Sequence, residues 1–336
     1  MPDKRRAILE YVSADPGAPI TADRVRQGIA GDVLARAWSH IGAEVCREYY
    51  VNDLSGGASA ETTDEPWNSL RAVGIEFDRI VRESTVVGSG AVDAVVSDLL
   101  AGGNAEVRDG AVWLRSASQG DSQDRVLKRA DGRPTYLAVD LAYHRDKFLR
   151  GFDLAVDLWD TRHEDYVART WVGLGAVGVD PERLRIAIVH PVRILDGGIE
   201  RRNGPGDAPW NVATLVARLT VSALRLRLAL FPLGETAWLD LDQGRTDPLT
   251  ERIARAGRLP VATNDSDPAL VLVRAKANGL DDIVAQAVAH QAPNRIAEYC
   301  IDLASAIVAA GRSTATAKAA LTQAVGLLGV EELLVA

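Results

Sequence analysis

The sequence contains only two cysteines, Cys46 and Cys300, and no long run of apolar residues. Two thiols so far apart in the chain imply no disulfide framework of the kind that stabilises small secreted domains. No segment approaches the roughly 18 uninterrupted apolar residues that a membrane-spanning helix needs. The charged start of the chain does not develop into a signal peptide, because Glu10, Ser13 and Asp15 interrupt the apolar residues that follow it. We therefore expect a cytoplasmic protein with no membrane partner.

A net positive charge is also missing. The chain has 38 Lys and Arg against 46 Asp and Glu, which gives a formal net charge of −8. Non-specific binding to nucleic acid depends on a broad basic surface that releases counterions from phosphates. The charge balance therefore argues against DNA as a partner, although a local basic patch could still contact RNA. His40, His144, His190 and His290 have no metal-ligand spacing among themselves or with the cysteines, so the sequence predicts no metal site.

The chain does contain the alternation of strand and helix patterns that is typical of α/β proteins. Residues 6–12 and 44–51 have the pattern of strands, and residues 23–41 between them carry apolar side chains at three- and four-residue spacing. This order predicts a βαβ unit at the start of a parallel sheet. Within 336 residues there is room for two domains.

Further along the chain the patterns become less regular. We predict an insertion over about 54–125, a strand followed by a loop over 133–140, strands over 154–159 and 185–192, and a helix over 166–179. Gly, Pro and charged residues over 197–209 predict a mobile loop near a domain boundary. Helical spacing returns over 210–230 and 280–310. The predicted domains are residues 1–205, α/β, and residues 206–336, all helical.

Several blocks of residues carry a resemblance to one enzyme family. The blocks are ILEYVSADPGAPI at 8–20, REYYVND at 47–53, DGRPTY at 131–136, DLAYH at 140–144, DKF at 146–148 and RIAEY at 295–299. Together they resemble the arginyl-tRNA synthetases over essentially the whole chain. The resemblance implies a class I synthetase fold, with a Rossmann-like parallel sheet and an insertion. An all-α, anticodon-binding-like domain of the DALR type would follow it.

The two signatures with which this family handles ATP are altered. HVGH falls on Thr21, Ala22, Asp23 and Arg24, and KMSKR falls near Arg201 and Arg202. Losing one preorganised donor of this kind costs roughly 10²–10³ in rate, and a carboxylate at Asp23 would also repel phosphates. The resemblance therefore implies that no catalytic residue is intact. It also implies no certain cofactor, with ATP used only if the altered signatures still function.

The residues expected to face arginine are better preserved. A guanidinium is matched by carboxylates that accept paired hydrogen bonds and by an aromatic face. The resemblance assigns these roles to Glu10, Tyr136 and Asp140, and it also places His163 against the substrate. Asp15 stands where the family has an Asn that contacts the backbone groups of the amino acid. Because a carboxylate at Asp15 would oppose a free carboxylate, the ligand is either arginine or a derivative such as an ester or amide.

Each of these residues also has a plainer interpretation. Taken singly, Glu10 fits a solvent-facing strand residue, Tyr136 a half-buried sheet residue and His163 a surface histidine. Three functions remain open. The first is a synthetase-like protein that binds arginine or an arginyl group without normal adenylation. The second is an active ligase that joins arginine to tRNA or to a small acceptor through altered motifs. The third is a tRNA-binding module without catalysis, whose affinity for tRNA is weakened.

Overall fold

The computed structural model describes residues 5–14, 16–54, 66–202, 209–244, 246–264 and 267–335. Contacts divide the chain into two compact units. The first unit combines residues 1–18, 44–66 and 77–188, and the second combines residues 19–43, 67–76 and 189–336. Asp15, one of the predicted site residues, lies outside the described residues. The domain boundary predicted near residue 205 stays a prediction.

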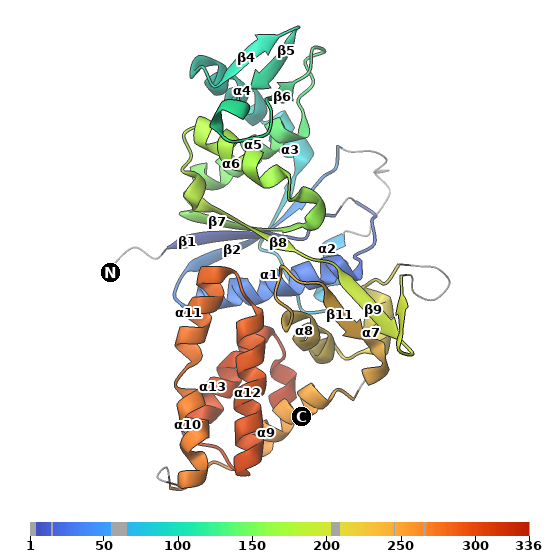
Figure 1. The fold of residues 1–336 in the computed structure, drawn as a ribbon, viewed down its shortest axis with the longest axis vertical. Helices are drawn as coiled ribbons and strands as arrows, with labels where there is room; N and C mark the ends of the chain where they lie inside the picture. Colours follow the sequence, from blue (N-terminus) through green and yellow to red (C-terminus); the bar gives the residue numbers. More distant parts are fainter. Residues whose placement is uncertain are drawn as a thin grey trace. The chain divides into compact units, whose positions relative to one another are not determined.

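A five-stranded sheet forms the centre of the first unit (Figure 1). Its order is β3-β2-β1-β7-β8, with β1 at Arg6–Tyr11, β2 at Glu44–Val51, β3 at Arg79–Arg82, β7 at Leu154–Asp160 and β8 at Leu184–Val189. The pairs β1–β2, β1–β7 and β2–β3 are parallel. The parallel sheet confirms the predicted fold class. It also confirms strands over most of residues 6–12, 44–51 and 154–159.

Helices and a second, smaller sheet complete this unit. The helices are α3 (Glu83–Gly88), α4 (Ala91–Ala101), α5 (Tyr136–Leu149) and α6 (Tyr166–Ala176). The small sheet is antiparallel and contains β4 (Ala105–Arg108), β5 (Ala111–Leu114) and β6 (Arg125–Lys128). These elements include most of the predicted insertion. One strand within the same span, β3, instead joins the edge of the central sheet next to β2.

Helix α5 corrects the prediction of a strand and loop over residues 133–140. The helix begins at Tyr136 and most of its side chains are buried, including Asp140, His144 and Lys147. A helix that is buried on nearly all sides shows no alternation of apolar and polar faces. The spacing that reveals an amphipathic helix is therefore absent from this segment.

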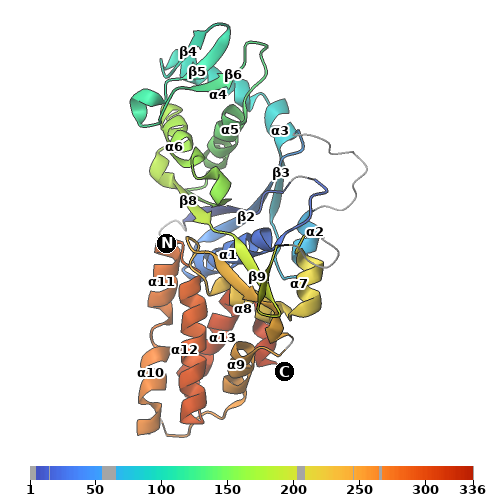
Figure 2. The same ribbon diagram turned by 45° about the vertical axis from the view of Figure 1, so that its right-hand side comes forward.

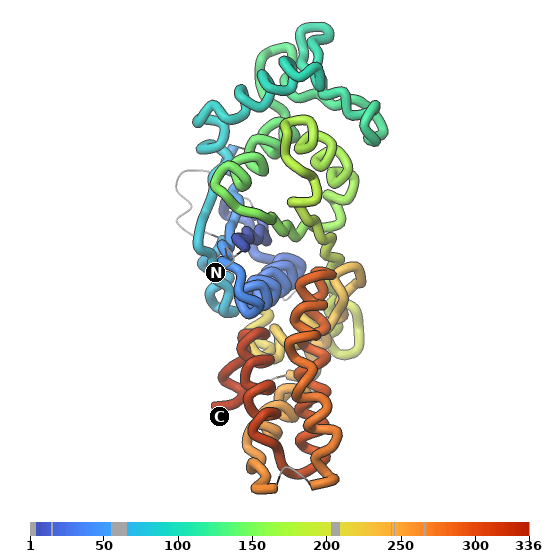
Figure 3. Tube along the Cα trace, turned by 90° about the vertical axis from the view of Figure 1, so that its left-hand side faces the viewer, coloured from blue at the N-terminus to red at the C-terminus, as the bar shows by residue number. Residues whose placement is uncertain are grey.

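The second unit contains the helix α1 and the C-terminal two fifths of the chain. Its other elements are α2 (Pro66–Arg71), β9 (Val192–Asp196), β10 (Ile199–Arg201), α7 (Val212–Arg218), α8 (Val221–Ala229), β11 (Ala237–Asp240), α9 (Pro248–Arg258), α10 (Val271–Ala277), α11 (Leu280–His290), α12 (Asn294–Ala310) and α13 (Ala315–Leu328). Helix α1 spans Ala22–His40 and packs against α8, α11 and α13. The strands form a small sheet in the order β10-β9-β11. Its strand β9 is labelled in Figure 2. Helix α12 packs against α10, α11 and α13, as the orange and red tubes of Figure 3 show.

One strand prediction near this part of the chain was wrong, and two short strands were not predicted. Residues 185–192 do not form one strand, because β8 ends before His190 and β9 begins after Pro191 in a different sheet. Proline has no N–H to donate to a sheet ladder, so the chain leaves one sheet and enters another at this point. The strands β10 and β11 were missed because they are only three and four residues long. Among the described residues, none of the helices has the length and apolar character needed to span a bilayer.

A buried charge network and a signature cavity

Three carboxylates stand in a row across the central sheet of the first unit. Glu10 on β1 is the register partner of Glu48 on β2 and of Asp157 on β7. Register partners in neighbouring strands point to the same face of a sheet. Helix α5 meets this row with cations, since Lys147 contacts Glu10 and Asp157 while Arg150 contacts Glu48. The acidic row is thus matched by Lys147 of α5 and by Arg150, the residue that directly follows this helix.

The contacts form a continuous chain, which we call the charge network. Lys147 Nζ lies 2.6 Å from Glu10 Oε2 and 2.9 Å from Asp157 Oδ1. His144 Nε2 lies 2.6 Å from Asp157 Oδ2, and His144 Nδ1 lies 3.3 Å from Asp140 Oδ1. The network therefore joins Glu10 to Asp140, the two carboxylates that the sequence assigned to a guanidinium.

Burial and charge act in opposite directions on the protonation of the network. Burial disfavours a charged imidazole, but the neighbouring carboxylates Asp140 and Asp157 outweigh it and raise the pKa of His144 to about 10. Burial also works against ionisation of Asp157, yet Lys147 and His144 hold its pKa below the usual value. For Glu10, burial raises the pKa while Lys147 opposes the rise. At neutral pH the network contains an imidazolium and an ammonium among carboxylates.

The atoms of Glu10, His144 and Asp157 that could bind a metal ion lie within 4.8 Å of one another. No local sequence pattern predicts this group, because its three residues come from three separate elements. The ammonium of Lys147 hydrogen-bonds both carboxylates at 2.6 and 2.9 Å. A cation of the protein itself is thus already placed among these groups, which makes the cluster an ion-pair network.

The structure brings three of the predicted arginine-binding residues into one region. Glu10 is 7% exposed and Asp140 is 9% exposed, whereas Tyr136 at the start of α5 is 43% exposed. Burial raises the pKa of the Tyr136 hydroxyl, and the charges of Asp140, Glu10 and Glu83 raise it further. Carboxylates therefore surround a partly accessible aromatic ring. Glu10 does not face solvent, and Tyr136 belongs to a helix and not to a sheet.

His163 lies at the edge of the same region, in a turn of 3-10 helix at Thr161–His163. Its Nδ1 is 2.9 Å from Asp160 Oδ1, and the His163 ring lies 6.0 Å from the ring of Tyr166. The Tyr166 ring is in turn 5.9 Å from that of Tyr136. His163 is thus linked to Tyr136 through an intervening aromatic ring.

Sequence reasoning missed two further residues of this region. Glu83, buried at the start of α3, and Tyr50, at the end of β2, both belong here, since the charges of Glu83, Asp140 and Glu10 raise the pKa of Tyr50. The ring of Tyr50 also packs 4.6 Å from that of Tyr143. Glu83 lay in a span without regular periodicity, so no local pattern marked it. A signal did exist for Asp157, which is an acidic residue inside the apolar strand LAVDLWD.

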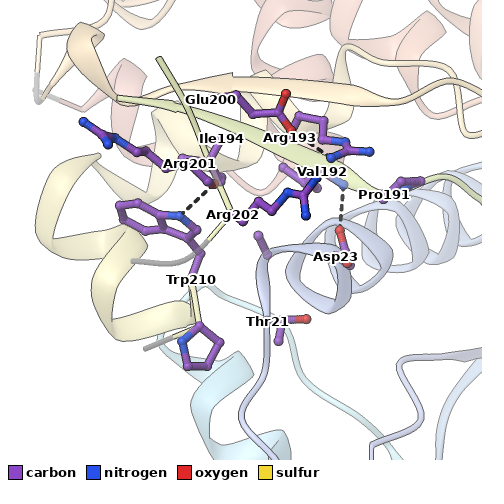
Figure 4. Close-up of a pocket in the computed structure, with 12 residues that line it drawn as sticks. Thr21, Asp23, Pro191, Val192, Arg193, Ile194, Glu200, Arg201, Arg202 and Trp210 are labelled. Carbon is purple, nitrogen blue, oxygen red and sulfur yellow. Dashed lines mark hydrogen bonds and ion pairs between the residues drawn. The ribbon is translucent and has the colours of Figure 1, made fainter. Parts of the chain in front are cut away.

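In the second unit, residues from both altered signatures line a single cavity of about 300 Å³, which we call the signature cavity (Figure 4). Its lining residues are Thr21, Ala22, Asp23, Pro191, Val192, Arg193, Ile194, Glu200, Arg201, Arg202, Pro209 and Trp210. The cavity therefore joins the start of α1 to β9 and to the end of β10. Of the other predicted signature positions, Arg24 is not part of the described lining.

The charged groups of the signature cavity are held mainly by the backbone and by each other. Asp23 Oδ1 accepts the Val192 backbone N–H at 2.6 Å, and Arg193 lies 2.8 Å from Glu200. Arg202 points toward Val192 and Asp23 in Figure 4, whereas Arg201 points the opposite way. The carboxylate of Asp23 thus attaches β9 to the first turn of α1.

A second side chain of α1 strengthens this attachment. Arg26 is fully buried, and burial lowers the pKa of its guanidinium to about 10. The guanidinium donates hydrogen bonds of 2.7 to 3.4 Å to the backbone oxygens of His190, Pro191, Phe231, Pro232 and Glu235. The chain that leads into β9 is therefore fixed to α1 from two directions.

Comparisons with known proteins agree with the blocks seen in the sequence. The chain is 30% identical over 251 residues to the arginine–tRNA ligase of Nitratiruptor sp., which covers 57% of this chain and 47% of that protein. It is also 30% identical over 379 residues to the arginine–tRNA ligase of Frankia alni, covering 89% of this chain and 69% of that protein. The chain thus spans about half the length of the first relative. No protein-family profile matches the chain.

Solved structures show the same fold. A chain assigned as an arginyl-tRNA synthetase from Campylobacter jejuni superposes with a TM-score of 0.82 at 21% identity, covering 98% of this chain and 93% of that chain. The arginyl-tRNA synthetase of Thermus thermophilus gives a TM-score of 0.76 at 16% identity, covering 98% and 83%. The fold is shared with these synthetases, and the sequence match to the Frankia alni enzyme extends over more than two thirds of its length. The chain therefore belongs to the arginine–tRNA ligase family.

Proposed function

We propose that this protein binds the side chain of arginine, or of an arginyl group, and has lost ordinary ATP-dependent adenylation. The observation that carries the proposal is a contrast in residue chemistry. The first unit keeps Glu10, Asp140 and Tyr136 together, whereas the signature cavity contains no histidine among its described lining residues.

The residues of the first unit suit a guanidinium. This planar cation is best held by carboxylates that accept paired hydrogen bonds, and it gains further from an aromatic face. Asp140 and Glu10 supply acidic side chains, and the ring of Tyr136 is accessible. The nearby Glu83 adds to the negative potential. A ligand with a neutral side chain would not offset this negative potential.

The signature cavity suits a triphosphate poorly. Arg193 is already paired with Glu200, and Asp23 adds a carboxylate that the amide of Val192 holds in place. Arg201 points away from the start of α1. Catalysis by this family depends on cations and donors aimed at the phosphates, and each missing donor costs about 10²–10³ in rate.

One observation favours the second candidate, an active ligase that uses altered motifs. Arg202 points into the neighbourhood of Val192 and Asp23, so one permanent cation remains beside the helix start. An arginine can bind phosphate oxygens in pairs where a lysine acts as a point charge. In that case Arg202 would take over part of the role of the second signature, with tRNA or a small molecule as the acceptor.

The two candidates are separated by arginine-dependent exchange of pyrophosphate into ATP. We expect no exchange above a control that lacks arginine, because the phosphate-binding groups are altered. Thermal shift with arginine alone should stabilise the protein by mass action, and citrulline, which is uncharged at the same position, should not. Clear exchange would establish the second candidate. Absence of any arginine binding would overturn both.

A further inference from the structure

Asp157 occupies the centre of the charge network. Its side chain is fully buried on β7, and its two oxygens face different cations. Oδ1 lies 2.9 Å from Lys147 Nζ, and Oδ2 lies 2.6 Å from His144 Nε2. Beyond these cations stand the two carboxylates expected to contact the guanidinium, since Lys147 contacts Glu10 and His144 contacts Asp140.

The five side chains of the charge network include one more carboxylate than basic groups, and the nearby Glu83 is a further acidic group. Glu10, Asp140 and Asp157 contribute three negative charges, and His144 and Lys147 contribute two positive ones. Burial makes an unpaired carboxylate unfavourable, because water no longer screens its charge. A single positive charge beside Glu10 and Asp140 would complete the balance. An arginine side chain carries one such charge at all physiological pH values.

We propose that Asp157 is a positioning residue that selects a monocationic side chain by holding His144 and Lys147 against Asp140 and Glu10. This inference rests on the proposed arginine site, and Asp157 acts through its two partners. It goes beyond that site by naming the residue that sets the charge of the pocket. The same residue also sets the position of both guanidinium-facing carboxylates.

An asparagine at position 157 could not accept hydrogen bonds from both His144 and Lys147. Asparagine offers one acceptor oxygen, and its NH₂ group would face either the ammonium of Lys147 or the imidazole of His144. One of the two cations would then lose its partner in a buried place. A buried charge without a partner is strongly disfavoured, so His144 would release its proton at a lower pH.

The groups around His144 come from three elements. Asp140 and Lys147 face it from its own helix α5, Asp157 from β7 and Glu10 from β1. The rings of Tyr143 and Trp159 pack at 5.3 and 6.2 Å. Of the charged neighbours, only Lys147 opposes protonation of His144. Removal of the Asp157 charge therefore leaves Asp140 and Glu10 as the groups that favour the imidazolium.

The test uses the full chain with and without the substitution Asp157→Asn. Calorimetry would measure arginine and citrulline binding at about pH 6 and about pH 8, a range in which only a histidine of ordinary pKa changes its charge. The wild-type chain should bind arginine equally at both values and citrulline about a hundredfold more weakly, as expected when a charged partner is lost. Asp157→Asn should bind arginine about tenfold more weakly at the lower pH and recover part of the loss at the higher pH. Asp93→Asn, an exposed substitution of the same kind, should leave arginine binding unchanged.

Nuclear magnetic resonance of the His144 imidazole in the ligand-free chain gives an independent measurement, with His144→Gln to assign the signal. In the wild-type chain His144 should stay protonated through about pH 8, and in Asp157→Asn it should titrate within this range. Unchanged affinity and unchanged titration in Asp157→Asn would overturn the proposal. If that variant does not fold, an ordinary His144 pKa in the wild-type chain would overturn it. If the wild-type chain binds no arginine, the proposed function fails, while the imidazole signal still reports whether Asp157 holds these charges.

Discussion

The charge network and the signature cavity satisfy their charges in different ways. In the network, Glu10, Asp157 and Lys147 are buried and each contacts a side chain of opposite charge. In the cavity, Asp23 is exposed and is held by a backbone amide, and the exposed Arg202 follows β10. The network is a buried set of side chains that contact one another, and the cavity is lined by several exposed charged groups.

This difference explains how one region can change while the other stays intact. Removing one member of a buried ion-pair network leaves its partner charged and unpaired, which costs several kcal/mol of folding free energy. Replacing an exposed residue usually costs much less. Substitutions at the exposed positions of the signature cavity should therefore cost little folding free energy, whereas substitutions within the network should cost much more.

The largest expected effect comes from breaking the network at its ammonium. Lys147→Met leaves Glu10 and Asp157 without their buried cation, and we expect the free energy of unfolding to fall by about 3–5 kcal/mol. Urea unfolding followed by circular dichroism would measure it. Lys276→Met removes a lysine paired with Asp302 at the surface and should cost at most about 1 kcal/mol. Equal losses of unfolding free energy in the two variants would show that the buried network stabilises the fold no more than a surface ion pair does.

A second prediction concerns ligand binding. Asp140→Asn keeps the size of the side chain but removes its charge, so arginine affinity should fall about tenfold to a hundredfold, which corresponds to about 1.4–3 kcal/mol. Isothermal titration calorimetry would measure the change. Asp146→Asn lies on the same helix but is largely exposed, and it should bind arginine as the wild-type chain does. If Asp140→Asn bound arginine with wild-type affinity, the guanidinium could not be bound by this part of the network.

The third prediction is a dependence of stability on pH. The pKa of His144 is raised to about 10 in the folded chain, so the folded state binds this proton more tightly than the unfolded state does. The contribution to stability is complete below the ordinary histidine pKa and is lost as the pH rises through about 10. The loss is at most about 1.4 kcal/mol per pH unit. Urea unfolding from neutral to alkaline pH should show a steeper decline in the wild-type chain than in His144→Gln, and parallel declines would contradict the assignment.

The smallest effect should come from the signature cavity. Asp23→Ala removes the acceptor of the Val192 amide, and we expect a loss of about 1 kcal/mol in stability. Asp23→Asn retains an oxygen at the same place and should lose less. Thermal unfolding of the pair would measure both. Neither variant should acquire arginine-dependent exchange of pyrophosphate, because the histidines of the first signature are still absent. If Asp23→Ala lost as much stability as Lys147→Met, Asp23 would behave as a buried network residue and not as an exposed one.

The parts of the fold that could be predicted are those with a clear local pattern. The strands β1 and β2 and the helix α1 between them have regular apolar spacing, and the structure confirms them. Helix α5 was missed because burial on nearly all sides removes that spacing. The division between β8 and β9 was missed because apolar residues continue through Pro191, and only sheet pairing shows that the chain changes sheets there.

The candidate site shows a similar division. Glu10, Tyr136 and Asp140 were found because they belong to contiguous blocks that resemble a family. Asp157 and Glu83 come from separate segments, and their importance depends on partners that are distant in sequence. The contact between Lys147 and Glu10 spans 137 residues, so no local window of sequence could contain it. For Asp23, the sequence indicated electrostatic repulsion of phosphate but gave no sign of its bond to the Val192 amide.

The row of Glu48, Glu10 and Asp157 has a consequence for assembly of the sheet. Side chains alternate between faces along a strand, so a shift of one residue in the pairing of β1 would turn Glu10 to the opposite face. Lys147 and Arg150 could then no longer reach all three carboxylates from one helix. Only the native register lets these ions enter the interior together. These buried charges therefore also act as a check on the alignment of three strands drawn from distant parts of the chain.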